Sequence, residues 1–259
     1  MQKILALFVA VGLAALPLSA HAKTITLVAD VWCPYNCERA SEKQGFMVEI
    51  AREAFEKHGI TVEYATMPWA QAIEETRSGK HTAIIGASIN DAPDFIFPAI
   101  EQGWMNMQFF VAKDSRWNYS GKESLSRVAL GVVSAYAYGP SIDSYIRTHR
   151  NDPSRIQVAG GDNVIAHNVD ALLSGKVDAV LEDGHVMAYY LERSGLAGKV
   201  RKAGQLPVSD QNNLYIAFSP KDKSAKKYAF LLADEIAAMR TNGKLKEILD
   251  RYAIGDWRR

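Results

Sequence analysis

The fold is decided by the stretch Ser78-Gly79-Lys80-His81-Thr82-Ala83-Ile84-Ile85, which recurs 96 residues later as Ser174-Gly175-Lys176-Val177-Asp178-Ala179-Val180-Leu181. In each copy the pattern predicts that a helix ends at the glycine, that the lysine faces solvent and that a buried strand follows. A match this short also arises by chance between unrelated helix–strand junctions. The elements around each copy therefore decide whether it marks a repeat.

Around the first copy, strands are expected at residues 24–29, 61–64 and 83–85, and a helix at residues 69–77. A further helix is expected after the first strand, because five apolar residues share one helical face: Met47, Ile50, Ala51, Ala54 and Phe55. Strands that alternate with amphipathic helices are typical of α/β layers with parallel strand pairing.

The same order of elements begins again near residue 128. Strands are expected at residues 128–133, 155–158 and 177–181, and helices at residues 141–149 and 162–173. Because the βαβαβ order surrounds both copies, we predict an α/β protein with two similar lobes.

Two extended apolar stretches, residues 109–113 and 214–218, stand where the chain would have to cross between the lobes. We interpret them as hinge strands. Lobe one would then comprise residues 23–110 and 219–259, and lobe two residues 111–218.

The first 22 residues differ in character from the rest of the chain. Lys3 precedes an apolar run of about 15 residues, whereas a membrane-spanning helix needs roughly 20. Small residues follow in Ala20-His21-Ala22. We interpret residues 1–22 as a signal peptide cleaved after Ala22, and a retained anchor is the alternative. The mature chain is expected to be soluble and periplasmic.

The charges of the chain are balanced, with 30 Lys and Arg against 29 Asp and Glu. Such a chain has no strong field to attract nucleic acid or anionic lipid. We therefore expect no binding to nucleic acid. We also expect the protein to be a monomer.

The two cysteines, Cys33 and Cys37, lie just after the first mature strand. Because an exported protein meets an oxidising compartment, we expect a disulfide that closes a short loop. Free thiols are the alternative. A metal site is disfavoured, since the sequence has no further cysteine and no histidine close to the pair.

In open α/β sheets, ligands bind beyond the carboxyl ends of the strands. Those ends are residues 30–32, 86–88, 134–136 and 182–183, which line one cleft if the lobes face each other. Four aromatic residues fall at or beside these ends: Trp32, Trp69, Tyr136 and Tyr138. They suggest an enclosure for stacking or cation–π contacts, and packing in the core is their alternative role.

Signatures of catalysis are scarce. The sequence has no Gly-x-Ser-x-Gly elbow, no zinc-protease spacing of histidines and no phosphate-binding glycine loop. Asp30, Glu182 and Asp183 are candidates for an acid–base set, although acids at strand ends also cap helices or bind a cationic group. We expect no catalysis, no metal and no cofactor.

Five loose motifs follow one another in a specific order over nearly the whole mature chain. They are Gly45-Phe46-Met47-Val48-Glu49-Ile50, Pro68-Trp69-Ala70-Gln71-Ala72, Ala87-Ser88-Ile89-Asn90, Gly175-Lys176-Val177-Asp178-Ala179-Val180-Leu181-Glu182-Asp183 and Met239-Arg240-Thr241-Asn242-Gly243-Lys244-Leu245. In this order they resemble the family-3 extracellular solute-binding proteins, the periplasmic receptors of polar amino-acid ABC transporters. The resemblance implies a type II periplasmic binding protein fold that closes on a small solute, with an ABC permease as partner.

The resemblance also implies roles for individual residues. Asp30 and Trp32 match contacts from the first strand, and Trp69 matches an aromatic residue that stacks on the ligand. The segment Gly86-Ala87-Ser88 matches the part that holds the ligand through backbone and hydroxyl groups, and Asp183 matches the acid that binds an α-ammonium group. With the aromatic residues, the expected ligand-binding set is Asp30, Trp32, Trp69, Gly86, Ala87, Ser88, Tyr136, Tyr138 and Asp183.

Two departures from the family concern the ligand's carboxylate. Pro93 stands where the family has an arginine, and Ala135-Tyr136-Ala137 replaces a turn rich in hydroxyl groups. A buried carboxylate without its partner is costly. We therefore expect a cationic or neutral polar solute rather than a simple amino acid.

The function expected from these residues is capture of a small polar solute for an ABC importer. Two alternatives stay open. One is an enzyme on the same scaffold, such as a lyase resembling cyclohexadienyl dehydratase, which would use the acids of the cleft. The other is a periplasmic sensor or accessory protein that hands its ligand to another protein.

Overall fold

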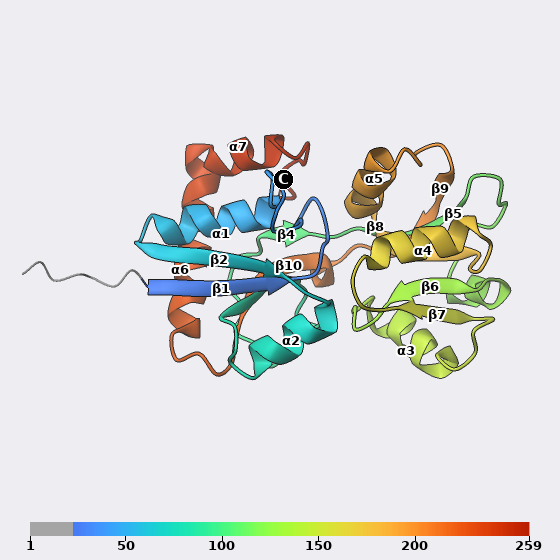
Figure 1. Cartoon of the computed structure of the whole chain (residues 1–259), viewed down its shortest axis with the longest axis horizontal. Helices are drawn as coiled ribbons and strands as arrows, with labels where there is room; N and C mark the ends of the chain where they lie inside the picture. The colour runs from blue at the N-terminus through green and yellow to red at the C-terminus, as the bar shows by residue number, and fades with distance from the viewer. Residues whose placement is uncertain (1–22, 259) are drawn as a thin grey trace, which may run out of the picture.

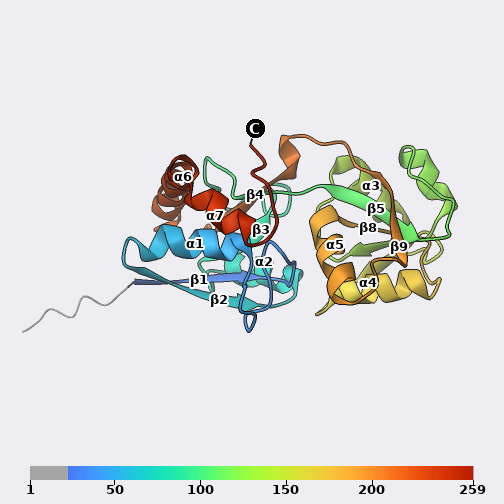
Figure 2. The same ribbon diagram turned by 90° about the horizontal axis from the view of Figure 1, so that it is seen from above.

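The computed structural model describes residues 23–258, which form two lobes, each with a five-stranded sheet flanked by helices (Figures 1 and 2). The prediction of a two-lobed α/β fold is therefore confirmed. The predicted signal peptide, residues 1–22, lies outside the described residues. None of the helices formed by residues 23–258 combines the length and the apolar character needed to cross a bilayer.

Lobe one has the strands β1 (Lys23–Ala29), β2 (Ile60–Thr66), β3 (Ala83–Ala87), β4 (Gly103–Trp104) and β10 (Asn213–Phe218). Its helices are α1 (Phe46–Glu56), α2 (Trp69–Arg77), α6 (Ala225–Asn242) and α7 (Lys244–Asp250). The sheet order is β2-β1-β3-β10-β4, with β1 parallel to both neighbours and β10 antiparallel to both. The predicted apolar face of α1 is buried in the core of this lobe.

Lobe two has the strands β5 (Met107–Ala112), β6 (Leu130–Val133), β7 (Ile156–Ala159), β8 (Ala179–Asp183) and β9 (Val200–Gln205). Its helices are α3 (Pro140–His149), α4 (Val164–Leu173) and α5 (Gly184–Arg193), with a 3-10 turn η1 (Lys122–Arg127) before β6. The sheet order is β7-β6-β8-β5-β9, the same arrangement as in lobe one. Here β6 is parallel to β7 and β8, and β5 is antiparallel to β8 and β9.

The repeat found in the sequence has the same geometry in both lobes. Gly79 after α2 and Gly175 after α4 have φ values of +91° and +74°. The amide of the next residue donates to the carbonyl five residues back: Lys80 to Glu75 at 2.9 Å, and Lys176 to Ala171 at 2.8 Å. Both helices therefore end in the Schellman arrangement that the two glycines predict.

A second bond repeats just before β3 and β8. The Thr82 hydroxyl accepts from the amide of Thr26 at 3.1 Å, and the Asp178 carboxylate accepts from the amide of Ala129 at 2.8 Å. In each lobe the repeat thus ties the incoming strand to its parallel neighbour.

The stretches that we expected to be hinge strands, residues 109–113 and 214–218, fall almost entirely in sheet strands and do not form the crossings. Residues 107–112 are β5, inside the sheet of lobe two, and β10 lies inside the sheet of lobe one. The chain crosses at residues 105–106 and 206–212, where the Met105 amide donates to the Asn212 carbonyl at 2.9 Å. The sequence of a buried central strand resembles that of a hinge strand, because both are extended and apolar. Phe109 in β5 and Ile216 in β10 are fully buried.

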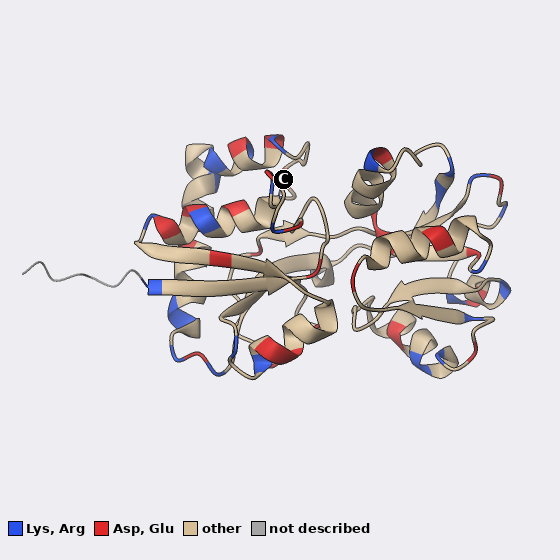
Figure 3. Ribbon diagram, viewed as in Figure 1, with Lys and Arg blue, Asp and Glu red and all other residues tan. Residues whose placement is uncertain are grey.

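Positions occupied by charged residues of both signs are interspersed along the ribbon of both lobes in Figure 3. This agrees with the formal net charge of +1 for the whole chain.

Candidate functional site

Three neighbouring cavities are lined by residues of both lobes. The base cavity has a volume of about 30 Å³, which is room for about one water molecule. A middle cavity of about 450 Å³ shares Asp30 with the base cavity. A third cavity of about 350 Å³, here called the α5 chamber, shares Val31, Glu38 and Asn163 with the middle cavity. The space between the lobes is therefore narrow at its base and wide toward α5.

A disulfide between Cys33 and Cys37 closes the loop that follows β1, so the predicted bond is present. The loop rests on the start of α1, where the Phe46 amide donates to the Pro34 carbonyl at 3.0 Å. Gly45 permits this contact, because it has φ +108° and a Cβ there would lie 2.4 Å from the Tyr35 carbonyl oxygen. The first strand end is thus held rigidly against lobe one.

The loop places Trp32 against an acid of the other lobe. The Trp32 ring stacks on Tyr35, with ring centres 4.4 Å apart. Its indole nitrogen Nε1 donates to Glu182 Oε1 across the cleft at 2.8 Å. The other oxygen of Glu182, Oε2, is buried and has no hydrogen-bond partner among residues 23–258. One oxygen of this acid therefore lacks a donor in the described part of the chain.

Tyr136 fills the base of the cleft. Its hydroxyl donates to the Asp30 carboxylate of lobe one. Its ring meets Trp32 and Trp69 edge to face, with ring centres 6.3 and 6.5 Å apart. The turn that carries it contains Ala135 at φ +64°, a strained conformation for a residue with a Cβ. These contacts explain why so little empty volume remains in the base cavity.

Asp91 is a third acid at the base. Ser88 binds its Oδ2 atom through both the backbone amide, at 2.7 Å, and the hydroxyl, at 2.6 Å. The amide of Ala137, from lobe two, donates to Oδ1 at 3.1 Å. The acid therefore joins the end of β3 to the turn after β6.

The three acids are held in an environment that opposes their ionisation. Burial raises the pKa of Glu182 to about 8, against the bonds from Trp32 and the Asp183 amide. Burial likewise raises the pKa of Asp30 to about 6 and that of Asp91 to about 6. No lysine, arginine or histidine lines the base cavity among the described residues. The base cavity is therefore a desolvated acidic site without a positively charged side chain in its lining.

The expected ligand-binding residues separate into two groups. Five of them line the base cavity or meet there: Asp30, Trp32, Trp69, Gly86 and Tyr136. Ala87 is fully buried in β3, and Ser88 is occupied by Asp91. Tyr138 lies in the core of lobe two, where its hydroxyl accepts from the Val133 amide at 2.7 Å.

Asp183 has structural partners. Its Oδ1 accepts from the amides of His185 and Val186 at 2.8 and 3.1 Å, which caps α5, and its Oδ2 accepts from the Asn106 amide at 2.7 Å. Both oxygens are thus engaged by backbone donors. The adjacent Glu182 instead accepts from Trp32 of the other lobe.

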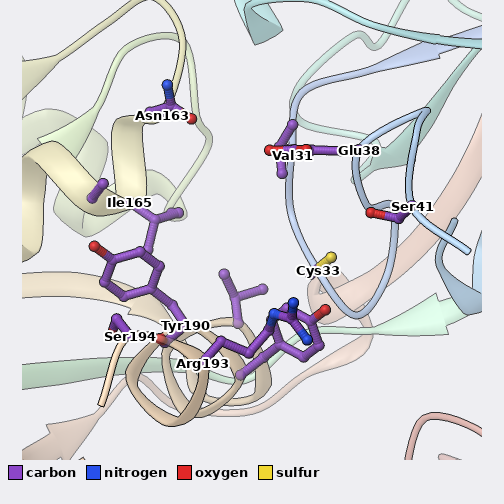
Figure 4. Close-up of a pocket in the computed structure, with 12 residues that line it drawn as sticks. Val31, Cys33, Glu38, Ser41, Asn163, Ile165, Tyr190, Arg193 and Ser194 are labelled. Carbon is purple, nitrogen blue, oxygen red and sulfur yellow. Dashed lines mark hydrogen bonds between the residues drawn. The ribbon is translucent and has the colours of Figure 1, made fainter. Parts of the chain in front are cut away.

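The α5 chamber was not foreseen from the sequence. Figure 4 shows one wall from lobe one and the opposite wall from lobe two, the labelled residues being Val31, Cys33, Glu38, Ser41, Asn163, Ile165, Tyr190, Arg193 and Ser194. The sequence contains a pattern that indicates the lobe-two wall of this chamber. Along α5, the spacing i, i+3, i+4, i+7 places four residues on one helical face: Val186, Tyr189, Tyr190 and Arg193.

Solved structures with the same fold come from several functional settings. A histidine kinase sensor domain with similarity to periplasmic binding proteins has a TM-score of 0.72 at 19% identity, covering 88% of this chain and 95% of its own. An amino acid ABC transporter substrate-binding protein from Streptococcus pneumoniae, bound to L-arginine, has a TM-score of 0.68 at 17% identity, covering 88% of this chain and 94% of its own.

A third structure, the ancestral amino acid-binding protein AncCDT-1, is described as a precursor of cyclohexadienyl dehydratase. Its TM-score is 0.67 at 17% identity, covering 88% of this chain and 94% of its own. At such identities the likeness shows the fold, which is the predicted type II periplasmic binding protein fold. Among curated proteins, no significant relative is found by sequence.

The sequence itself carries the family assignment. The profile described as "Bacterial extracellular solute-binding proteins, family 3" matches residues 25–255, which is nearly the whole described chain. The protein therefore belongs to the family-3 bacterial extracellular solute-binding proteins.

Proposed function

We propose that this protein is exported to the periplasm, binds a small cationic or neutral polar solute between its lobes and presents it to an ABC permease. The family supports a solute-binding role. The amino-terminal segment, with its short apolar run and small residues before Lys23, supports export. The proposed contacts are those that meet at the base cavity, together with Asp91 and Glu182.

The cationic or neutral class of the ligand is inferred from the acids at the base cavity, which have no positively charged partner there. Asp30 and Asp91 line the base cavity, Glu182 accepts from Trp32 of its wall, and no basic side chain among the described residues lines the cavity. A buried acid gains from a charged donor, because such hydrogen bonds are roughly twice as strong as neutral ones. Trp32, Trp69 and Tyr136 add aromatic faces that suit a cation.

Uptake of the solute requires the base to open. In the free protein, Tyr136 and Trp32 donate to Asp30 and Glu182 across the cleft. An ammonium or amidinium group would offer donors to the same carboxylates. Binding would therefore exchange contacts between the lobes for contacts with the ligand, and so shift the equilibrium between conformations.

The decisive experiment is calorimetric titration with butylamine, small polar neutral compounds and the standard amino acids. We expect butylamine to bind, and Glu182→Gln to weaken its affinity about tenfold or more through loss of a buried charge partner. Glu192→Gln is the matched control, because Glu192 is an exposed acid on α5 outside the three cavities.

Tight binding of an α-amino acid whose affinity collapses on methyl-esterification would overturn the proposal. It would reveal a carboxylate grip that the base does not contain. Mass spectrometry of small molecules released from the natively purified protein gives an independent answer, since a retained solute would be identified directly.

A catalytic role is the second candidate, and the raised pKa of Glu182 favours it. In the free protein, a carboxyl group with a pKa of about 8 holds its proton at neutral pH and is suited to act as a general acid, whereas a bound cation would favour its ionised form. Chromatography of candidate substrates before and after incubation tests this role. Turnover that is lost in Glu182→Gln would establish it, whereas ligands recovered unchanged would support the receptor.

A further inference from the structure

The α5 chamber is a second space for ligand that the base acids do not explain. The base cavity measures about 30 Å³, whereas the chamber measures about 350 Å³ and the cavity between them about 450 Å³. A solute bound only by the base acids would leave most of this space to solvent. The larger volume thus points to a ligand with more than a cationic group.

The lobe-two wall of the chamber includes one face of α5. Val186, Tyr189, Tyr190 and Arg193 recur at helical spacing, and all of them line the chamber. From Val186 to Arg193 the helix rises by roughly 10 Å. Val31 and the disulfide-bonded Cys33 line the same chamber from lobe one. The walls therefore suit an apolar segment of about that length.

The two ends of this path differ in charge. Glu182 lies just before α5, at the acidic base, and Arg193 is the last residue of the helix. The Arg193 guanidinium stands over the Tyr189 ring at 5.5 Å and forms no ion pair with residues 23–258. Arginine binds carboxylates in a bidentate manner, so its free guanidinium favours an anionic group at this end.

We propose that the solute is a linear dipolar molecule, with its cationic end at the base acids, its apolar middle along α5 and an anionic end at Arg193. This inference rests on the proposed function for the cationic end. The apolar middle of this molecule would span roughly 10 Å, the rise of the helix from Val186 to Arg193, and its two charges would lie at least that far apart. A simple α-amino acid, whose charges are adjacent, does not meet this requirement.

Three other charged side chains line the path and have to be distinguished. Glu38 lies on the lobe-one wall of the chamber, opposite in charge to Arg193. Arg39 and the acid Asp162 line the middle cavity, to which Asp30 also belongs. If Arg39 took the anionic end, a shorter ligand would be preferred, so the length of the best ligand tells the two arginines apart.

The test is calorimetric titration with four probes: butylamine, octylamine, 4-aminobutanoate and 8-aminooctanoate. We expect 8-aminooctanoate to bind at least about tenfold more tightly than 4-aminobutanoate, through the added charge-assisted bond and the buried chain. Arg193→Gln should remove most of the advantage of 8-aminooctanoate over octylamine while leaving octylamine unchanged. Arg150→Gln, at an exposed arginine of lobe two outside the cavities, is the matched control.

Each contrary result has a separate meaning. Equal binding of 8-aminooctanoate and octylamine, or an equal loss for both in Arg193→Gln, would overturn the dipolar ligand while leaving the cationic site intact. A loss caused by Arg39→Gln in place of Arg193→Gln would overturn the assignment of the anionic end. Failure of butylamine itself to bind would overturn the proposed cationic site and this inference with it.

Discussion

The two lobes share one scaffold and present different walls to the cleft. The sheet of lobe one runs β2-β1-β3-β10-β4 and that of lobe two β7-β6-β8-β5-β9, with the same parallel and antiparallel pairs. Both copies of the repeat end a helix and start a strand in the same way. At the carboxyl ends of the strands the likeness stops, and that is where ligand would be held.

The acids show the difference most clearly. Asp91 of lobe one has both oxygens engaged, Oδ2 by the amide and hydroxyl of Ser88 and Oδ1 by the Ala137 amide of lobe two. Glu182 of lobe two has its one side-chain donor in Trp32, from the other lobe, and keeps one oxygen unpaired among residues 23–258. The comparison teaches that a duplicated scaffold fixes where groups stand, while local hydrogen bonds decide which of them are free to meet a ligand.

The largest effect is expected from the aromatic wall of lobe one. Trp69→Ala should weaken binding of butylamine by roughly 10- to 100-fold, or 1–3 kcal/mol, because a stacking face is lost. Tyr136→Phe in lobe two keeps its ring and should change affinity less than about threefold. Calorimetry on both variants, with their melting temperatures, makes the comparison. A large fall in melting temperature at unchanged affinity would assign Trp69 to the core.

In the free protein, the buried acids of the two lobes should lower the free energy of unfolding over different ranges of pH. Their pKa values are higher in the folded chain than their ordinary values of 4.5 for Glu and 3.8 for Asp. The native state then binds more protons than the unfolded state, so the free energy of unfolding falls as pH rises. The fall due to Asp30 and Asp91 should be complete near pH 6 to 7, and that due to Glu182 should continue to about pH 8.

Urea unfolding at a series of pH values measures this dependence. Glu182→Gln should abolish most of the decline between pH 6 and pH 8 while preserving the decline below it. This variant retains Asp183, whose pKa is also raised by burial. A decline above pH 6 that persists in Glu182→Gln would contradict the assignment to lobe two.

The glycines of the repeat allow a direct comparison between the lobes. Gly79→Ala and Gly175→Ala should each lower the free energy of unfolding by about 1 kcal/mol, because both glycines have positive φ. Gly79→Ala should lose more, since its Cβ would lie 3.1 Å from Lys221 Cβ, whereas nothing lies within 4 Å at Gly175. Equal losses in urea unfolding would show that this contact relaxes freely.

The smallest effects are expected at the strand starts. Thr82→Ala and Asp178→Ala each remove one hydrogen bond to a backbone amide of the parallel neighbour. Each should lower the free energy of unfolding by roughly 0.5–1.5 kcal/mol. Similar values in urea unfolding would confirm that the repeat is energetically as well as geometrically equivalent, and a difference above about 1 kcal/mol would argue against it.

Local pattern was enough to predict the scaffold. The glycine after each repeat helix has a conformation that its position in the sequence predicts, and the apolar spacing of α1 identifies its buried face. The placement of β5 in the sheet of lobe two and of β10 in the sheet of lobe one was not predictable in the same way. It depends on pairing between segments far apart in the chain, and buried central strands have the same composition as crossing strands.

Some residues that line the base cavity could be predicted from the sequence, and others could not. Asp30, Trp32 and Trp69 were identifiable because strand ends gather at one edge of a sheet. The roles of Glu182 and Asp183 were not, since neighbouring residues of a strand point to opposite faces and the sequence leaves open which face meets the cleft. Tyr138 also looks like a cleft residue until its bond to the Val133 amide places it in the core.

The return of the chain to lobe one through β10 has a consequence for the order in which the two lobes fold. The sheet of lobe two is made from one continuous stretch, residues 107–205, whereas β3 of lobe one waits for a partner, β10, that follows roughly 125 residues later. A chain that emerges amino-terminus first therefore carries the unpaired edge of β3 until lobe two has already been made. We expect lobe two to fold first and lobe one to be the slower and more aggregation-prone half, so that protection by a chaperone matters most for the half that begins the chain.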